Sequence, residues 1–155
     1  MTGKIEARLA ELGLNLPEAP APVANYVPYL MAGDLLFISG QVSKAADGTI
    51  VCGRLGDGLA IADAQTAARH CALNILAQAK AALGDLDRVA QVLRLTGYVA
   101  STPESGDQPK VINGASNLMV EVLGDAGRHT RVAVGVAALP GGCAVEIDAI
   151  LRVTA

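Results

Sequence analysis

Aromatic residues are scarce in this sequence, making up 3% of it, and there is no tryptophan. Side chains on which nucleic-acid bases stack are therefore nearly absent. Clusters of lysine and arginine are missing as well, and the net charge is −3 with a sequence pI of about 5.3. Binding along a phosphate backbone needs clustered positive charge, so these deficits argue against a nucleic-acid partner.

Cysteines are also few. Cys52, Cys71 and Cys143 cannot all pair with one another, and their spacing matches no zinc motif. We expect reduced thiols in a cytoplasmic protein, with no metal site. No apolar run approaches the roughly 20 residues of a membrane span. Charged residues interrupt the N-terminus where a signal peptide would be apolar, so we expect no membrane contact.

The chain is instead aliphatic, with 52% hydrophobic residues among 155, and we expect one domain over 1–155. Apolar residues at helical spacing predict a short helix over 2–13. Prolines follow this helix, so residues 1–22 are expected to form an N-terminal extension. Further along, strands are predicted over 26–31, 35–42 and 49–55.

The strongest helical pattern covers 59–83, where small apolar residues recur on one face before Gly84. A strand over 89–100 and a second helix over 107–123 follow. Helices and strands do not alternate strictly, so we expect an α+β fold with two helices on one face of a mixed sheet. The other face would be apolar and uncovered, which predicts oligomerisation through the sheet.

The C-terminal stretch 130–154 contains two β-branched runs separated by Leu-Pro-Gly-Gly, a pattern that predicts a β-hairpin. Arg131 begins the first run and Glu146 lies inside the second. Hairpin pairing would put Arg131 opposite Ile150 or Leu151, about 14–17 Å from Glu146 in the same chain. The two residues could then share one site only if different subunits supplied them.

These two residues are the main chemical candidates. The planar guanidinium of Arg131 matches the two oxygens of a carboxylate, although a structural salt bridge or an exposed charge is the alternative. Glu146 could activate water, although it could also face solvent on an alternating strand. His129 would lie near a cleft mouth, and His70 is a weaker candidate. Cys143 lacks a paired histidine and is expected to be an incidental thiol.

The residues also carry a family resemblance. The pattern Arg131-x-Ala-Val-Gly-Val-x-x-Leu-Pro, followed by Val-Glu-Ile-Asp-Ala-Ile, resembles the C-terminal signature of the RidA family, also called YjgF/YER057c/UK114. The segment Phe-Ile-Ser-Gly-Gln-Val over 37–42 is similar to that family's strand-end motif. Tyr26 and Asn113 fall where the family carries a tyrosine and an asparagine. The leading helix and prolines resemble those of a longer-chain subgroup.

The resemblance implies a chorismate-mutase-like α+β fold: a mixed six-stranded sheet, two helices on one face and a short N-terminal helix. It also implies a homotrimer with clefts between subunits. The function implied is hydrolytic deamination of reactive 2-imino or enamino acids to 2-keto acids and ammonia, without metal or organic cofactor. The residues carried over are Arg131 for the substrate carboxylate and Glu146 for water, with a lining of Tyr26, Ser39, Gly40, Asn113 and Ala133.

Two positions depart from the deaminase pattern. Deaminase members commonly have cysteine two residues after the arginine, where this chain has Ala133, and often an acidic residue at the position of Gly135. The alternative is therefore a non-catalytic module that binds or senses a small carboxylate on the same fold. A third reading, ribonuclease or translation inhibitor, is opposed by the acidic pI.

Overall fold

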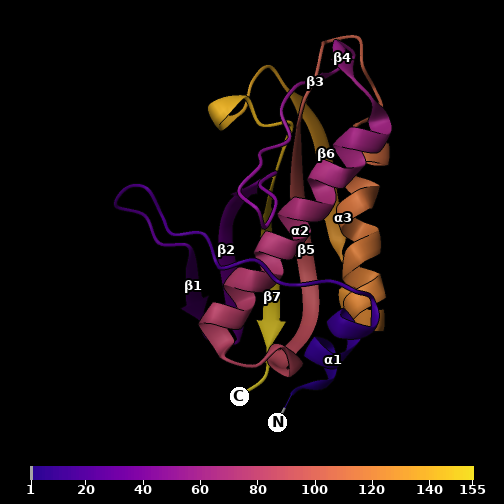
Figure 1. The fold of residues 1–155 in the computed structure, drawn as a ribbon. Helices are drawn as coiled ribbons and strands as arrows, with labels where there is room; N and C mark the ends of the chain where they lie inside the picture. The colour runs from indigo at the N-terminus through magenta and orange to yellow at the C-terminus, as the bar shows by residue number, and fades with distance from the viewer. Residues whose placement is uncertain (1) are drawn as a thin grey trace.

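The computed structural model describes residues 2–155, so Met1, the first residue of the predicted domain and extension, lies outside the described residues. Its elements are α1 (Lys4–Glu11), β1 (Tyr29–Ala32), β2 (Leu35–Val42), β3 (Arg54–Leu55), β4 (Gly58–Leu59), α2 (Ile61–Leu83), β5 (Val89–Ala100), α3 (Gln108–Leu123), β6 (Thr130–Val136) and β7 (Val145–Val153) (Figure 1). Short 3₁₀ turns cover Leu86–Arg88, Gly124–Gly127 and Pro140–Gly142. No helix within residues 2–155 has the length and apolarity needed to cross a membrane.

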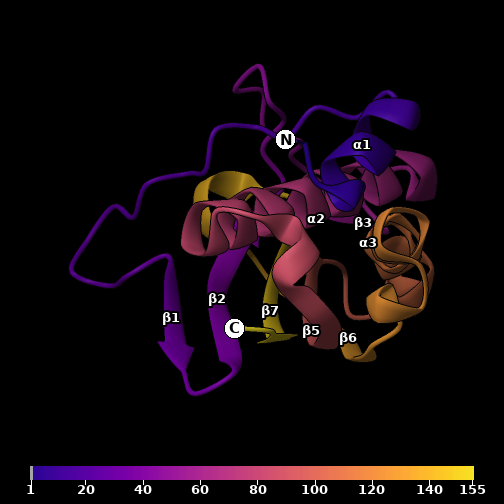
Figure 2. The same cartoon turned by 90° about the horizontal axis from the view of Figure 1, so that it is seen from below.

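The main sheet has five strands in the order β1-β2-β7-β5-β6. All neighbours are antiparallel except β5 and β6, which run parallel, so the sheet is mixed. Figure 2 shows the strands side by side in this order, with α2 and α3 together on one side. The predicted mixed α+β fold with two helices on one face is therefore confirmed.

The helix α2 packs against the sheet through small side chains. Ala64, Ala68, Cys71 and Ile75 are fully buried at helical spacing, as the sequence pattern predicted. The helix ends at Gly84, whose φ of 75° lies in the left-handed region that glycine adopts readily. Short side chains let the helices and the sheet approach closely, which suits a chain with so few aromatic residues.

The N-terminal helix is confirmed within its predicted range and packs against α3 and the 3₁₀ turn at Leu86–Arg88. The backbone N–H groups of Lys4 and Ile5 each donate 2.9 Å hydrogen bonds to the Asp87 carboxylate. This carboxylate satisfies two amides that the first helical turn would otherwise leave unpaired. Leu9 is buried against the core, so the apolar face of this helix packs on the rest of the domain.

The predicted strand over 49–55 is wrong, so the main sheet has five strands rather than six. This segment makes isolated bridges, Lys44 with Ile50 and Cys52 with Cys143, before the small parallel pair β3–β4. Gly53 has φ 120°, a left-handed conformation that breaks the regular extension of a strand. The predicted strand over 26–31 also starts later, at Tyr29, because Pro28 cannot donate to the ladder.

The predicted C-terminal hairpin is also wrong. β6 and β7 do not pair with each other, because β5 lies between them and hydrogen-bonds to both. Arg131 is therefore opposite Leu95, and not Ile150 or Leu151. The Pro-Gly-Gly sequence forms a 3₁₀ turn in a connection long enough to cross the end of β5. Local turn signals cannot reveal an inserted strand, because β5 comes from an earlier part of the chain.

Candidate functional site

Arg131 lies at the start of β6 and its side chain extends along α3. Its Nη1 donates to the Ser116 hydroxyl at 3.1 Å and its Nη2 to the Pro109 carbonyl at 3.3 Å. Asn113 lies between these two contacts at helical spacing, so it shares their face of α3 and is exposed. Ala133 follows on the same face of β6. We call Asn113, Ser116, His129, Arg131 and Ala133 the arginine face.

His129 holds the hydroxyl that contacts Arg131. Its Nδ1 lies 2.6 Å from the Gly127 carbonyl oxygen, which can only accept, so Nδ1 carries the proton. In the neutral ring Nε2 then accepts from Ser116, 2.8 Å away. Burial lowers the pKa of His129. The hydrogen bond to the Gly127 carbonyl raises this pKa by less, and the nearby positive charge of Arg131 lowers it. A neutral His129 therefore orients Ser116, and Ser116 orients Arg131.

Glu146 lines a different pocket, of about 410 Å³, which no residue of the arginine face lines. Tyr26 and Gly40 line it as well, and we call this pocket the glutamate pocket. A Cβ atom at residue 40 would overlap the Glu146 carboxylate, so glycine there leaves room for that group. Tyr26 is exposed, with 52% of its surface accessible.

Buried amides hold the walls of the glutamate pocket. Asn74 donates from Nδ2 to the carbonyls of Val42 and Lys44, at 3.2 and 2.9 Å. Gln78 donates from Nε2 to the Pro20 carbonyl at 2.7 Å, which ties the proline-rich extension to α2. Ser39 does not line this pocket; its hydroxyl donates to the Val27 carbonyl at 2.7 Å and so positions the segment that carries Tyr26.

Burial raises the pKa of Glu146, and the neighbouring charge of Asp148 raises it further. Asp148 is two residues along β7, on the same face of the strand, and burial raises its pKa as well. A carboxyl group whose pKa is raised toward neutrality exchanges a proton more readily near neutral pH than an exposed one. The direction of this shift suits Glu146 to proton exchange.

The predicted site residues thus fall into two groups within one chain. Glu146 is on β7 and Arg131 is on β6, with β5 between these strands. Glu146 pairs with Tyr98 of β5 and Arg131 pairs with Leu95, three residues away along β5. With strands about 4.8 Å apart and about 3.4 Å per residue, their Cα atoms are roughly 14 Å apart. Arg131 also does not line the glutamate pocket. This estimate from the observed register agrees with the predicted separation, although the predicted pairing that led to it was wrong.

The sequence-based prediction did not include Ser116, Asn74 or Gln78. Ser116 is three residues after Asn113, so the helical spacing from a predicted site residue was the available signal. Asn74 and Gln78 are polar residues inside the apolar pattern of α2, a signal of buried hydrogen bonding. No group of three or more metal-binding side chains gathers anywhere between residues 2 and 155.

Several known proteins are similar to this chain in fold and sequence. Residues 6–150 match the family described as "YjgF/chorismate_mutase-like, putative endoribonuclease". Protein TCP17 of Trypanosoma cruzi is 48% identical over 152 residues, covering 97% of this chain and 95% of TCP17. The crystal structure of Atu1372 from Agrobacterium tumefaciens, a protein of unknown function, is 52% identical with a TM-score of 0.90, over 97% of this chain and 92% of Atu1372. Escherichia coli TdcF with bound serine is 25% identical with a TM-score of 0.66, over 88% and 94% of the two chains.

The mixed sheet with two helices on one face therefore defines an α+β protein of the chorismate-mutase-like type. The chain belongs to the RidA family, also called the YjgF family. The resemblance drawn from the motifs at 37–42 and 131–150 is confirmed.

Proposed function

We propose that this protein is a hydrolytic deaminase of 2-imino or enamino acids, acting at clefts between the subunits of a cytoplasmic homotrimer. The observation that carries this proposal is the state of Arg131. Its guanidinium is held by Ser116 and Pro109 and forms no ion pair with a carboxylate within residues 2–155. A fixed guanidinium without a counter-charge is suited to a carboxylate ligand.

In the proposed reaction Arg131 binds the substrate carboxylate, and Glu146 of an adjacent subunit takes a proton from water as its oxygen attacks the imine carbon. Glu146 then passes that proton toward the nitrogen. This gives a carbinolamine, whose hydroxyl proton then moves to the nitrogen as the C–N bond breaks and the C=O bond forms, so one imine and one water yield one keto acid and one ammonia. The raised pKa of Glu146 supports this exchange of protons. TdcF was crystallised with serine, whose carboxylate is of the kind that we propose Arg131 binds.

Assembly is supported by the sheet face that carries no helix. Leu30 pairs with Phe37, and Phe37 pairs with Ile150, so these apolar side chains form a row across three strands. Leu30 is 60% exposed and Phe37 is 39% exposed in the single chain. Contiguous exposed apolar surface on a sheet is commonly covered by another subunit. The three free cysteines support a reducing, cytoplasmic location.

The test is ammonia release from imino acids that an amino-acid oxidase generates in the assay. Wild type is expected to accelerate release. Arg131→Ala is expected to lower kcat/KM by roughly 100-fold or more, because removal of a charged hydrogen-bonding anchor loses several kcal/mol. Arg128→Ala is the matched control, since Arg128 is exposed and pairs only with Asp125. Equal activity in wild type and Arg131→Ala would contradict the proposed role.

A non-catalytic module that binds a small carboxylate is the second candidate, and Ala133 favours it. A methyl group at this position offers neither a proton nor a nucleophile beside the ligand. Under this alternative, wild type would not accelerate ammonia release from any imino acid, while keto or amino acids would still bind in an Arg131-dependent manner. Ribonuclease activity is the weakest candidate, because the chain carries a net charge of −3.

A further inference from the structure

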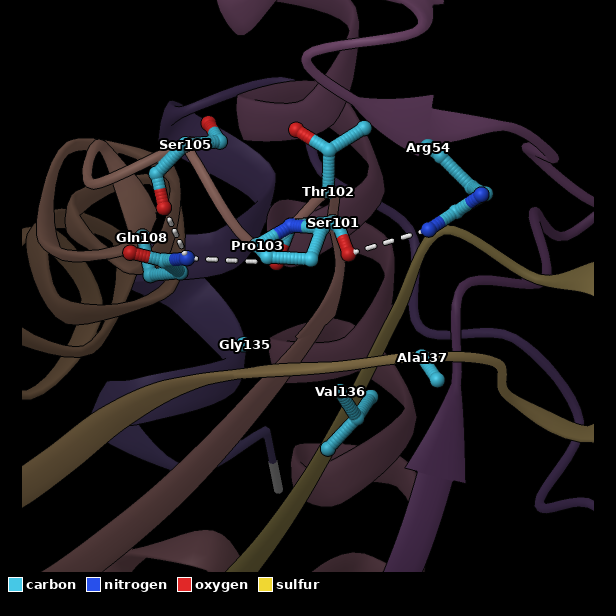
Figure 3. Close-up of a pocket in the computed structure, with 9 residues that line it drawn as sticks. All are labelled: Arg54, Ser101, Thr102, Pro103, Ser105, Gln108, Gly135, Val136 and Ala137. Atoms are coloured by element: carbon cyan, nitrogen blue, oxygen red, sulfur yellow. Dashed lines mark hydrogen bonds between the residues drawn. The ribbon is translucent and has the colours of Figure 1, made fainter.

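A separate pocket of about 340 Å³ lies at the far end of β6 from Arg131 (Figure 3). It is lined by Arg54 of β3 and by residues of the loop after β5, the start of α3 and the end of β6. Figure 3 shows Arg54, Thr102 and Ser105 along one side and Gly135 on the other, with Gln108 at one end. None of the predicted site residues lines this pocket. It is small by the standard of ligand pockets and suits a compact group.

Arg54 is the one charged residue among those that line the pocket. Its Nη2 donates to the Ser101 carbonyl at 3.3 Å. Its Nε is buried and has no hydrogen-bond partner within residues 2–155. No carboxylate of the described chain lies within ion-pair distance of it. A partly buried guanidinium with neither counter-charge nor full hydrogen bonding is costly, so a ligand that supplies negative charge would be stabilised there.

The walls offer further donors. Gln108 donates from Nε2 to the Ser101 hydroxyl at 3.1 Å and to the Ser105 carbonyl at 2.8 Å, which fixes the end of the pocket. The Thr102 and Ser105 hydroxyls take part in none of the hydrogen bonds inside the pocket, so both can donate to a ligand. Gly135 keeps the space open, because a Cβ atom there would overlap the Ser101 hydroxyl.

We propose that this pocket binds the oxyanion group of a small ligand, a carboxylate or a phosphate, with Arg54 as the anchor and Thr102 and Ser105 as hydroxyl donors. The planar fork of arginine and side-chain hydroxyls are donors that such groups accept from. Gly135 is four residues after Arg131, so the two sites are about 14 Å apart along β6. The proposal goes beyond the deaminase function and does not rest on it.

The test is a titration of the intact protein with inorganic phosphate and, separately, with acetate. Binding is followed by calorimetry and by amide chemical shifts of Thr102 and Ser105. We expect saturable shifts with at least one anion; phosphate alone would indicate a phosphorylated ligand, and acetate a carboxylate. Arg54→Gln removes the charge at similar size and should raise the Kd by roughly tenfold or more. Thr102→Val should weaken binding by a smaller factor.

The control is Arg131→Gln, which should leave anion binding at Thr102 and Ser105 unchanged. Three results would overturn the proposal: neither anion shifts these amides; the shifts disappear in Arg131→Gln but persist in Arg54→Gln; or Arg54→Gln breaks up the oligomer while wild type binds neither anion. The last would mean that Arg54 pairs with a neighbouring subunit. None of these measurements depends on ammonia release, so failure here is distinguishable from failure of the deaminase proposal.

Discussion

Arg131 and Glu146 lie on strands that flank β5, and their side chains point to opposite faces of the sheet. Arg131 pairs with buried Leu95 and reaches α3, whereas Glu146 lies between buried Val145 and Ile147 and therefore points away from the helices. One chain thus places the proposed carboxylate anchor at one edge of the sheet and the proposed acid–base residue elsewhere. This arrangement requires two copies for a complete site, if the two residues act together.

Mixing variants tests that requirement. Arg131→Ala and Glu146→Gln are each expected to be inactive as pure trimers. After denaturation and refolding together in equal amounts, about one quarter of the sites should contain both native residues, because each contributing subunit has an even chance of supplying its native residue. Ammonia release should recover accordingly. A mixture as inactive as its components, with mixed trimers verified by mass spectrometry, would place both residues in a single-chain site.

Gly40 is expected to control the position of Glu146. In Gly40→Ala the new methyl group overlaps the Glu146 carboxylate and pushes it aside. Because a misplaced catalytic group is costly, kcat/KM should fall by roughly 10- to 100-fold. Stability should change little, since the displaced atoms are the end of a flexible side chain. Gly106→Ala, where a Cβ meets nothing within 4 Å, is the control and should keep full activity.

Gly114 is expected to control the approach of α3 to α2. A Cβ there would overlap the Gln65 backbone carbonyl, which cannot move without shifting α2. Gly114→Ala should therefore lower the free energy of unfolding by about 1–3 kcal/mol. Urea denaturation followed by circular dichroism measures this change. A variant as stable as wild type would show that the helices separate without cost.

His129 is expected to make stability depend on pH. Burial holds its pKa below the ordinary value of 6.5, so the unfolded chain binds a proton more readily than the folded chain. The free energy of unfolding should therefore rise as the pH increases from the lowered pKa to about 6.5, and level off above that.

His129→Gln should remove part of this rise. His70 also has a pKa lowered by burial and contributes in the same direction, so the difference between the wild-type and variant curves isolates His129. Chemical denaturation between pH 5 and 8 measures both curves, a range that brackets the ordinary histidine pKa. Parallel curves would show that His129 is not buried neutral beside Ser116.

Local pattern was enough to predict the long elements. The predicted strand over 89–100 matches β5, and the helices over 59–83 and 107–123 match α2 and α3 within two residues. These elements have strong periodicity and end at Gly84 and Gly124, so short-range sterics and burial determine them. The motifs at 37–42 and 131–150 carried the family resemblance, and with it the candidates Arg131 and Glu146.

Strand pairing and side-chain partners were decided by the tertiary structure. The β-branched runs around Pro-Gly-Gly suit a hairpin, yet β5 enters between them, because burial of both its edges outweighs the local turn preference. The hydrogen bonds that join Ser116 to His129 and to Arg131, and the pocket that Arg54 and Gly135 both line, bring together residues far apart in sequence. Such contacts depend on how the helices pack on the sheet, and the local periodicity of the sequence does not predict that packing.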